Sequence, residues 1–552
     1  MNLIISSSLR TEKNKIKIDF ILLSLIWFAL AFFLDPLGDF PLNDDWVYGL
    51  SVKNFLEFHE FRPISWSAVT LISNTLWGAI FTIPYGFSFD ALRISTIIIS
   101  LFGILTFYLL IIRISKSRLL AIIGSLSLAF NPIYFSLSFT FMTDVPCLTF
   151  VLLATFFFVK AIKNESNLDL IIATIFSIIA TLSRQFSIAI PLAYAVSSLI
   201  TNKKTFAITI KHLSPLLVTI IFFIAFEFAL LYSGHMPGYQ LEQYTKIFHT
   251  AFSIIDISNL LDLTEKIISR SVKIILYMSL FLVPILLTVQ WNKFELSKKY
   301  FWIALPVLFI FSGSHLFPPE KLGNILCNYG IGPIALRDIF FLKINAPNSL
   351  PLIFWVGITL VTVIASSLLI FLGSKNINSI SLLSKEDKTL NLFFIFTLLI
   401  YSCIYIKIGF FDRYLLNLFP FLFLSIIFIL KPIKAKLRNY SLAFLYIIFL
   451  GGFSFFTTSD YLIFHKTKFL AIDSLIKSKN ITSQNIDGGY EYNGYYNYSE
   501  GYVASASKSW WWVEDDTYII TLGPVSGYSI LNEYKLKQFF PYSSSIFVLK
   551  KN

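Results

Sequence analysis

The feature that most constrains this chain is a succession of apolar runs, each about as long as a bilayer is thick. The hydrocarbon core of a bilayer measures about 30 Å, which a helix of about 20 residues spans. Apolar residues make up 56% of the chain and charged residues 14%, whereas a soluble domain has roughly half and a quarter. The sequence therefore predicts an α-helical membrane protein that crosses the bilayer many times.

The apolar runs recur along most of the chain and predict about thirteen transmembrane helices. The division between the fifth and sixth runs is the least secure, because only Ser183, Arg184 and Gln185 separate them. The predicted spans are residues 18–34, 91–112, 119–135, 145–160, 169–182, 186–201, 213–232, 271–290, 301–316, 351–372, 391–407, 414–430 and 441–457.

The distribution of charge predicts the orientation. The net charge is +12, and the Lys and Arg residues gather in the N-terminal tail and in every second loop, so that the basic loops are short and all lie on the side of the N-terminal tail. Such loops stay in the cytoplasm, so we expect the N-terminus there and, with an odd number of spans, the C-terminus outside. This pattern sets topology and excludes nucleic acid as a partner. No small-residue cleavage site precedes Asp35, so the first run is expected to be a membrane helix rather than a signal peptide.

The composition also predicts two domains. Residues 1–457 form the transmembrane domain, and its outer loop 35–90 carries surface helices, because another crossing there would invert the charge bias of every later loop. Residues 458–552 change to Tyr-, Gly- and Asp-rich segments with strand-like runs such as 517–521. They predict a small α/β domain on the extracytoplasmic side.

An acidic pair just after the first span is the first candidate site. Asn43 is expected to cap a helix that begins at Asp44. Asp44 and Tyr48 then share one face of this helix, while Asp45 points to the side. Acidic residues in a first helical turn also offset the helix dipole without any catalytic role. The sequence alone leaves these two interpretations evenly balanced.

Two further ionisable residues are predicted at the same membrane surface. Asp144 stands two residues before Pro146 at the start of the fourth span, where capping is the ordinary role. Ionisable groups at a membrane boundary beside a cavity are also functional candidates. Arg184 lies in the turn between the fifth and sixth spans. It is either a phosphate ligand or a boundary residue that contacts lipid headgroups.

A cationic group precedes the twelfth span. The chain there reads Asp412, Arg413 and Tyr414, with Lys407 close by. These residues can anchor the helix at the interface, or they can present Arg413 to an anionic lipid head. Acids and cations are thus predicted to converge on the outer face of one membrane bundle.

In this order, the motifs resemble the GT-C superfamily of membrane glycosyltransferases. Within it, they are similar to the branch of protein O-mannosyltransferases and aminoarabinose-lipid A transferases. The resemblance covers the topology of residues 1–457 and includes an outer C-terminal domain. It implies a GT-C fold of about thirteen helices.

The resemblance implies an inverting hexosyl- or pentosyltransferase that moves a sugar from a polyprenyl-phosphate donor to an acceptor hydroxyl on the extracytoplasmic face. Asp44 matches the leading Asp of the family's Asp-Glu-x-x-Tyr pattern, Asp45 replaces the Glu, and which of the two is the base stays open. Asp144 matches the second acidic position, as a third catalytic residue. The implied substrate-binding residues are Tyr48, Arg184, Lys407, Arg413 and Tyr414.

No metal or other cofactor is predicted. His59 and Glu60, with His235 or His315 of later loops, could supply metal ligands, but surface histidines are the ordinary interpretation. The acceptor is a lipid, a glycan or a protein. The protein mannosyltransferases carry a large outer module inserted in a central loop. No loop of this chain is long enough for such a module, which favours a lipid or polysaccharide over a protein as the acceptor. The Ile-, Lys- and Asn-rich usage indicates a bacterium and hence its cytoplasmic membrane.

Two other classes remain open. A transporter or flippase of lipid-linked saccharides tends to show paired halves with interrupted spans, and the sequence shows no such symmetry. A membrane polysaccharide polymerase or ligase would depend on Arg and His residues in a large late loop, which points to Arg337 within 317–350.

Overall fold

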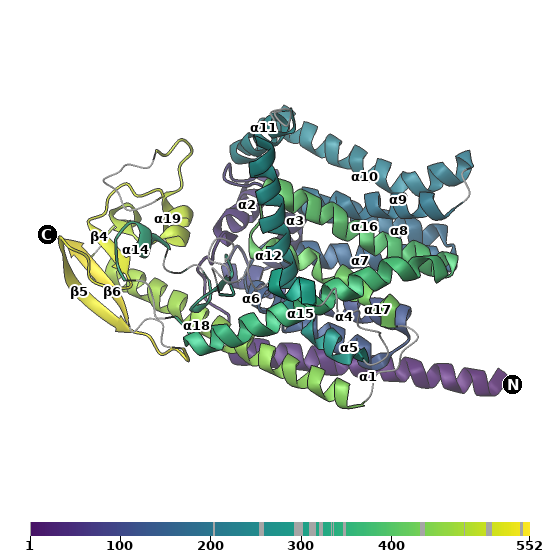
Figure 1. The fold of residues 1–552 in the computed structure, drawn as a ribbon. Coiled ribbons are helices and arrows are strands. Elements are labelled where there is room, and N and C mark those ends of the chain that lie inside the picture. Colours follow the sequence, from purple (N-terminus) through teal and green to yellow (C-terminus); the bar gives the residue numbers. More distant parts are fainter. Residues whose placement is uncertain are drawn as a thin grey trace.

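Helices make up most of the molecule, and they lie side by side in a bundle with a small sheet at one end (Figure 1). The structure is a computed structural model of the chain. It describes residues 2–202, 205–252, 259–291, 302–307, 316–318, 324–332, 334, 336–345, 349–430, 437–479, 481–503, 511–540 and 545–552.

Eight helices within the described residues are long and apolar enough to cross a membrane. Their outward faces suit lipid, since on one of them Ile221 and Phe228 are 63% and 65% exposed. A helix also satisfies its own backbone hydrogen bonds in hydrocarbon. The chain is a multi-pass membrane protein, as predicted. The spans lie in α1 (Asn2–Leu34), α4 (Phe89–Ser115), α7 (Asp144–Asn164), α10 (Phe206–Tyr232), α12 (Asn259–Thr288), α15 (Leu352–Ser379), α16 (Lys385–Ile408) and α18 (Leu437–Lys479).

Most of the other predicted spans form shorter apolar helices. The two least secure ones are distinct helices, α8 (Asn167–Ser183) and α9 (Ala189–Thr201), joined by a 3-10 turn at Gln185–Ile188. Residues 414–430 correspond to the 3-10 helix η4 (Asp412–Asn417) and to α17 (Phe419–Leu430). Most of the predicted span 301–316 lies outside the described residues.

One predicted span is divided in two. Residues 119–135 form α5 (Arg118–Ala129) and α6 (Pro132–Leu137). Pro132 has no backbone N–H to continue the hydrogen bonding of α5, and it takes the first position of a new helix. The side chain of Asn131 caps that helix, because it accepts the N–H of Ile133 at 3.0 Å.

The first outer loop carries two helices, α2 (Asp45–Phe58) and α3 (Ile72–Thr82), and neither is a candidate span. The helix cap at its start differs from the prediction. Asn43 lies one residue before the cap, with a left-handed backbone and φ of 56°, and α2 begins at Asp45 with Asp44 in the cap position.

A four-stranded sheet and one helix follow the last span. The sheet order is β3-β4-β6-β5, with β3 (Ile486–Asp487) parallel to β4 (Tyr518–Thr521). The other neighbours are antiparallel, β5 (Tyr528–Lys535) with β6 (Ser545–Lys551) and β6 with β4. Helix α19 (Tyr490–Asn497) connects β3 to the rest. We call residues 481–552 the C-terminal unit.

The predicted boundary at residues 457 and 458 falls inside α18. This helix has 43 residues and is therefore about 65 Å long, roughly twice the thickness of a bilayer core. Its second half extends beyond the bundle and contacts β4 and β6. One continuous helix thus joins the bundle to the C-terminal unit.

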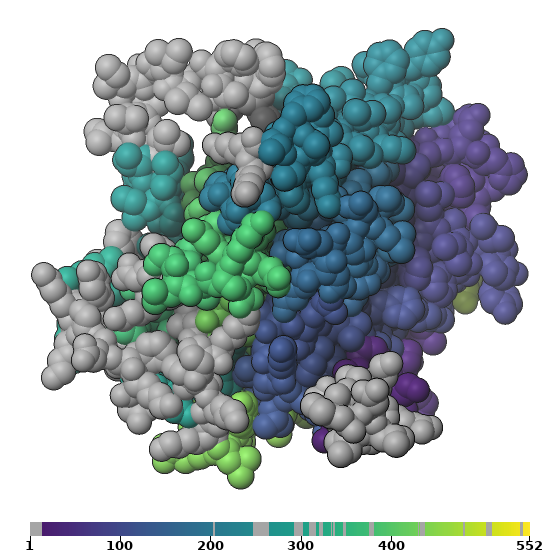
Figure 2. Space-filling model, turned by 90° about the vertical axis from the view of Figure 1, so that its right-hand side faces the viewer, coloured from purple at the N-terminus to yellow at the C-terminus, as the bar shows by residue number. Residues whose placement is uncertain are grey.

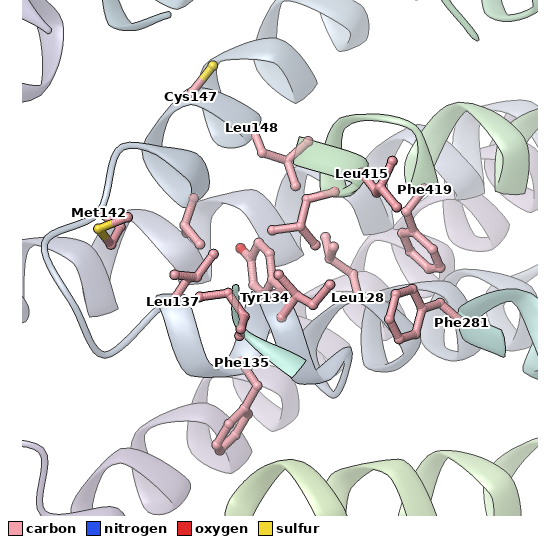
Figure 3. Close-up of a cluster of buried hydrophobic side chains, with 14 of the residues drawn as sticks. Leu128, Tyr134, Phe135, Leu137, Met142, Cys147, Leu148, Phe281, Leu415 and Phe419 are labelled. Carbon is pink, nitrogen blue, oxygen red and sulfur yellow. The ribbon is translucent and has the colours of Figure 1, made fainter. Parts of the chain in front are cut away.

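A dense apolar core includes side chains of α6, α7, η4, α17 and α12. Figure 3 shows Leu137, Leu148, Leu415, Phe419 and Phe281 within this cluster, and each is buried. Close packing of this kind leaves little room for adjustment. The packed core therefore holds in place the start of α7, which carries Asp144, and η4, which carries Arg413.

Candidate functional site

The candidate site is built where three helix starts meet. Asp44 precedes α2, Asp144 is the first residue of α7, and Arg413 is the second residue of η4. Side chains at such positions project from the helix ends, and the helices hold them in place. All three lie at one end of the bundle, as the alternation of spans predicts.

Asp44 is held by two donors from distant parts of the chain. The Nη2 of Arg413 donates to its Oδ2 at 2.9 Å, and the hydroxyl of Tyr490 donates to its Oδ1 at 2.8 Å. The side chain remains 22% exposed. Each carboxylate oxygen has further lone pairs, so Asp44 can still accept a proton or another hydrogen bond.

Arg413 is a buried cation with unused donors. Its Nε and Nη1 atoms are buried and have no hydrogen-bond partner among the described residues. The neighbouring Asp412 orients its backbone, because this carboxylate accepts the N–H groups of Arg413, at 2.8 Å, and of Leu326, at 2.7 Å. Burial raises the pKa of Asp412 to about 6, although these N–H groups oppose the shift. Unsatisfied donors on a buried cation are costly, so this guanidinium is suited to an anionic ligand.

A second pair lies beside the first. Arg184 makes a buried ion pair with Asp144, and its guanidinium carbon lies 4.7 Å from the ring centre of Tyr414. The guanidinium carbon of Arg413 lies 5.6 Å from the same ring centre. One aromatic ring therefore contacts both cations through its negative face.

Tyr48 belongs to the same group. Burial raises the pKa of its hydroxyl above the usual range, and the charge of Asp44 raises it further. The charges of Arg413 and Arg184 oppose this shift. The structure thus brings together six of the residues that the sequence singled out: Asp44, Tyr48, Asp144, Arg184, Arg413 and Tyr414.

The structure places Asp45 apart from this group. It is fully buried, and its two oxygens accept the N–H groups of Leu42, at 2.5 Å, and Phe141, at 3.3 Å. Burial raises its pKa to about 7, against the opposing charge of Arg93. No described contact joins Asp45 to Arg413 or Arg184, so it holds two loops together instead of facing them.

Lys407 also lies elsewhere. It is exposed in the last turn of α16, and only its backbone carbonyl has a described partner, the Nη1 of Arg270 at 3.2 Å. The sequence placed it near Arg413 because the two are close along the chain, but the turn after α16 separates them.

A cavity of about 310 Å³ opens on the other side of Asp44, between the bundle and the C-terminal unit. Its lining includes four residues that the sequence analysis missed. Tyr490 and Glu491 begin α19, and His465 and Lys468 come from the extended half of α18. The only signal in the sequence is the pair of glycines before Tyr490, which permits a sharp turn there.

The charged groups of this cavity are paired. The Nζ of Lys468 lies 2.9 Å from the Oε2 of Glu491, and both side chains are more than nine-tenths buried. Burial alone would raise the pKa of Glu491, but the Lys468 ammonium lowers it to about 2. Arg337 also lines the cavity, where it pairs with Asp487 at 2.7 Å and with Asp338 at 2.8 Å. Arg337 therefore joins the late loop to the sheet.

Within the part of the chain that the structure describes, no three His, Cys, Asp or Glu side chains form a group that could hold a metal ion. His59 ends α2 with a left-handed backbone, and Glu60 pairs with Arg62 at 2.7 Å. His315 lies outside the described residues.

The fold and the site define a multi-pass membrane protein with a charged site at one end of its helix bundle. The family model described as dolichyl-phosphate-mannose-protein mannosyltransferase matches residues 75–226, a stretch that contains Asp144 and Arg184. This match supports the resemblance that the motifs indicated. No curated protein matches the chain.

Two solved structures are similar to this chain. ArnT from Cupriavidus metallidurans, bound to undecaprenyl phosphate, is 10% identical with a TM-score of 0.40, and the similarity covers 96% of this chain and 97% of that one. The archaeal oligosaccharyltransferase AglB from Archaeoglobus fulgidus, in complex with an inhibitory peptide and a dolichol-phosphate, is 12% identical with a TM-score of 0.35. Here the similarity covers 82% of this chain and 56% of that one.

Proposed function

We propose that the chain is an integral-membrane inverting glycosyltransferase, which moves a sugar from a polyprenyl-phosphate donor to an acceptor hydroxyl on the extracytoplasmic face. The observation that carries this proposal is the position of Asp44. Its carboxylate lies between a buried arginine with unused donors and an open cavity. The matching family model, whose name describes a dolichyl-phosphate sugar as the donor, supports it.

The arginines suit a glycosyl phosphate. Breaking the bond between the sugar and the phosphate places negative charge on the leaving oxygen. Cations that are already in position stabilise this charge most effectively in a site with little water. Arg413 offers two free donor atoms. Arg184 contacts the same Tyr414 ring as Arg413 does. The planar fork of a guanidinium matches phosphate oxygens better than an ammonium does.

Asp44 acts as the general base in this proposal. The acceptor hydroxyl gives its proton to Asp44 while its oxygen attacks the anomeric carbon from the face opposite the phosphate. The bond from that carbon to the phosphate oxygen breaks, and the electron pair leaves with the lipid phosphate. The configuration at the anomeric carbon inverts. Asp144 positions Arg184 through their ion pair, and Asp45 keeps the loop before α2 in place.

A donor assay tests the proposal. The purified protein receives a panel of labelled polyprenyl-phosphate sugars, with and without crude envelope extract as a source of acceptor, and sugar release is measured. We expect Asp44→Asn to lose about 10²–10⁴-fold in rate, which is the usual contribution of a general base. The matched control is Asp35→Asn, an exposed acid of the same loop, which should keep the wild-type rate.

Two outcomes would overturn the proposal. One is an unchanged rate in Asp44→Asn. The other is a folded wild-type protein that releases no sugar from any donor even with envelope extract. Sugar release also separates transfer from transport, because a flippase leaves the sugar on its lipid.

A further inference from the structure

Asp44 is shared by two environments of different chemistry. Its Oδ2 meets Arg413, next to Arg184 and Asp144, and none of these three lines the cavity. Its Oδ1 meets Tyr490, which does line the cavity. If the phosphate of the donor lies on the arginine side, the cavity is the space from which an acceptor hydroxyl reaches Asp44.

Part of the cavity lining is aromatic. Trp66 and Trp511 both line it, with ring centres 5.1 Å apart and ring planes at 68°. The indole N–H of Trp66 donates to the hydroxyl of Tyr490 at 3.2 Å. An aromatic face carries partial negative charge, and it therefore attracts the row of polarised C–H groups on one face of a sugar ring.

Another part of the lining is polar and buried. His465 is 1% exposed, and neither of its ring nitrogens has a hydrogen-bond partner among the described residues. Buried polar atoms are nearly always paired, so these two nitrogens are free to bind a ligand that enters the cavity. One ring nitrogen of a neutral histidine donates and the other accepts, and a hydroxyl group can satisfy either. The Lys468–Glu491 pair beside it offers a donor and an acceptor to further hydroxyl groups.

The cavity does not suit an extended peptide. Strand β4 lines it with Ile520 and Thr521, and β4 is already paired with β3 on one side and with β6 on the other. No free strand edge of β4 remains for a peptide to join by backbone hydrogen bonds. A volume of about 310 Å³ lies at the lower end of the range for small-ligand sites, about 300–1,000 Å³.

From this combination we propose that the acceptor is a carbohydrate. One of its sugar rings stacks on Trp511 next to Trp66, its hydroxyl groups bind His465, Lys468 and Glu491, and one hydroxyl is thereby presented to Asp44. This inference rests on the proposed glycosyltransferase function and specifies its acceptor.

The test compares acceptors under conditions in which the wild type consumes a donor. The arms are methyl glycosides of common hexoses and their disaccharides, a peptide rich in Ser and Thr, and phosphatidylglycerol vesicles. We expect transfer to at least one saccharide. Trp511→Ala and His465→Gln should each raise the apparent KM for that saccharide about 10-fold, with a smaller effect of Trp511→Phe. Trp302→Ala, an exposed Trp outside the cavity, is the control and should leave KM and kcat unchanged.

The outcomes separate the two proposals. A wild type that consumes no donor contradicts the glycosyltransferase function itself. Donor consumption with transfer only to the peptide or to the vesicles, or with no saccharide stimulating it, overturns the carbohydrate acceptor alone. Saccharide transfer with an unchanged KM in both Trp511→Ala and His465→Gln overturns the assignment of this cavity.

Discussion

At the scale of single residues, the site depends on Asp44 being held in place from both sides. Arg413 precedes the twelfth predicted span and Tyr490 belongs to the C-terminal unit, so the two donors come from segments that are distant from Asp44 in sequence. The hydroxyl of Tyr490 also accepts the indole N–H of Trp66. The single proton of this hydroxyl is therefore free to be donated, and it is donated to Asp44. Tyr490 is a positioning residue in this arrangement.

Replacing Tyr490 with Phe removes this hydrogen bond and leaves the ring. A hydrogen bond to a charged group contributes about 1.5–3 kcal/mol, so we expect kcat for sugar transfer to fall at least about 10-fold. The KM for the donor should change little, because the arginines are untouched. Tyr496→Phe on the same helix is the control, since Tyr496 is half exposed. A kcat equal to that of the control would contradict the role of Tyr490.

Asp45 gives a prediction about pH. Its pKa is raised by burial from 3.8 to about 7, so the folded protein holds this proton more tightly than the unfolded chain does. Its contribution to stability is therefore complete below about pH 4 and is lost as the pH rises to about 7. Asp45→Asn lacks this contribution. The difference in Tm between wild type and variant should shrink across this interval, as measured by thermal unfolding in detergent.

The loss of stability in Asp45→Asn should be largest at low pH, where the contribution of Asp45 is complete. Asn has a single carbonyl oxygen, so either the N–H of Leu42 or that of Phe141 loses its partner. Such a loss costs about 1–3 kcal/mol, and the variant should be less stable by this amount at low pH. A Tm difference that does not change with pH would show that Asp45 is not the titrating group.

The two arginines also lead to a prediction about metal ions. If Arg413 and Arg184 supply the positive charge that the leaving phosphate needs, transfer requires no divalent cation. We expect activity after treatment with EDTA to equal that of the untreated protein. Arg413→Lys should lose about 10²-fold in kcat, because an ammonium replaces a fork of donors. Loss of activity in EDTA that Mg²⁺ or Mn²⁺ restores would contradict this account.

Half of the site could be predicted from the sequence for a topological reason. Asp144, Arg184 and Arg413 each adjoin a predicted span, and Asp44 lies in the first outer loop on the same side of the membrane, so counting spans was enough to bring them together. The contribution of Tyr490 could not be predicted, because nothing local in a Tyr- and Gly-rich turn indicates which distant residue it meets. Asp45 was misjudged because helix periodicity gives a direction relative to the helix but not the burial on that side.

At the scale of elements, the junction between bundle and sheet is secured by Arg337. Its guanidinium joins Asp338 on its own helix, α14 (Leu336–Phe340), to Asp487 in β3, and it also donates to the backbone carbonyl of Ile520 in β4. All of these groups are buried. The sequence suggested a catalytic role for Arg337 in a polymerase or ligase. In the structure, its described contacts are all explained by a structural role at this junction.

Arg337→Ala should loosen this junction. Removing one partner of a buried ion pair leaves the other charge without compensation and costs about 3–5 kcal/mol. We expect limited proteolysis to release the C-terminal unit from the variant much faster than from wild type. Arg62→Ala, which breaks an exposed pair with Glu60 worth about 0–1 kcal/mol, is the control. An intact junction together with lost activity would favour a direct catalytic role of Arg337.

The extent of α18 shows why element boundaries were harder to predict than elements. The composition becomes polar after residue 458, but a polar segment can remain helical where it packs on other elements. Phe464 and Ile472 are buried on this extension, and Asp460 accepts the N–H of Phe540 at 2.8 Å. Tertiary contacts of this kind extend a helix beyond the point where hydropathy alone would end it.

At the scale of the whole molecule, the two ends of the bundle differ in chemistry. The acidic and cationic site, the cavity and the sheet occupy one end, and the N-terminus lies at the other (Figure 1). Figure 2 looks onto the second end, where the start of α16 lies beside the ends of α7 and α9. Basic residues border this end, including Arg113, Lys116 and Lys160, and Lys160 pairs with Asp169 at 2.5 Å.

This asymmetry predicts the orientation in the membrane. Basic turns are retained in the cytoplasm, so the end shown in Figure 2 should face the cytoplasm and Asp44 should face the opposite compartment. In a background with Cys327 and Cys403 changed to Ser, single cysteines replace Lys116 and Asn532, both exposed. We expect a membrane-impermeant maleimide to label Asn532→Cys in intact cells and Lys116→Cys only after the membrane is opened. The remaining Cys147 is buried and supplies the unlabelled control. The reverse pattern would place the site in the cytoplasm and would contradict transfer on the extracytoplasmic face, even if the chemistry at Asp44 were as proposed.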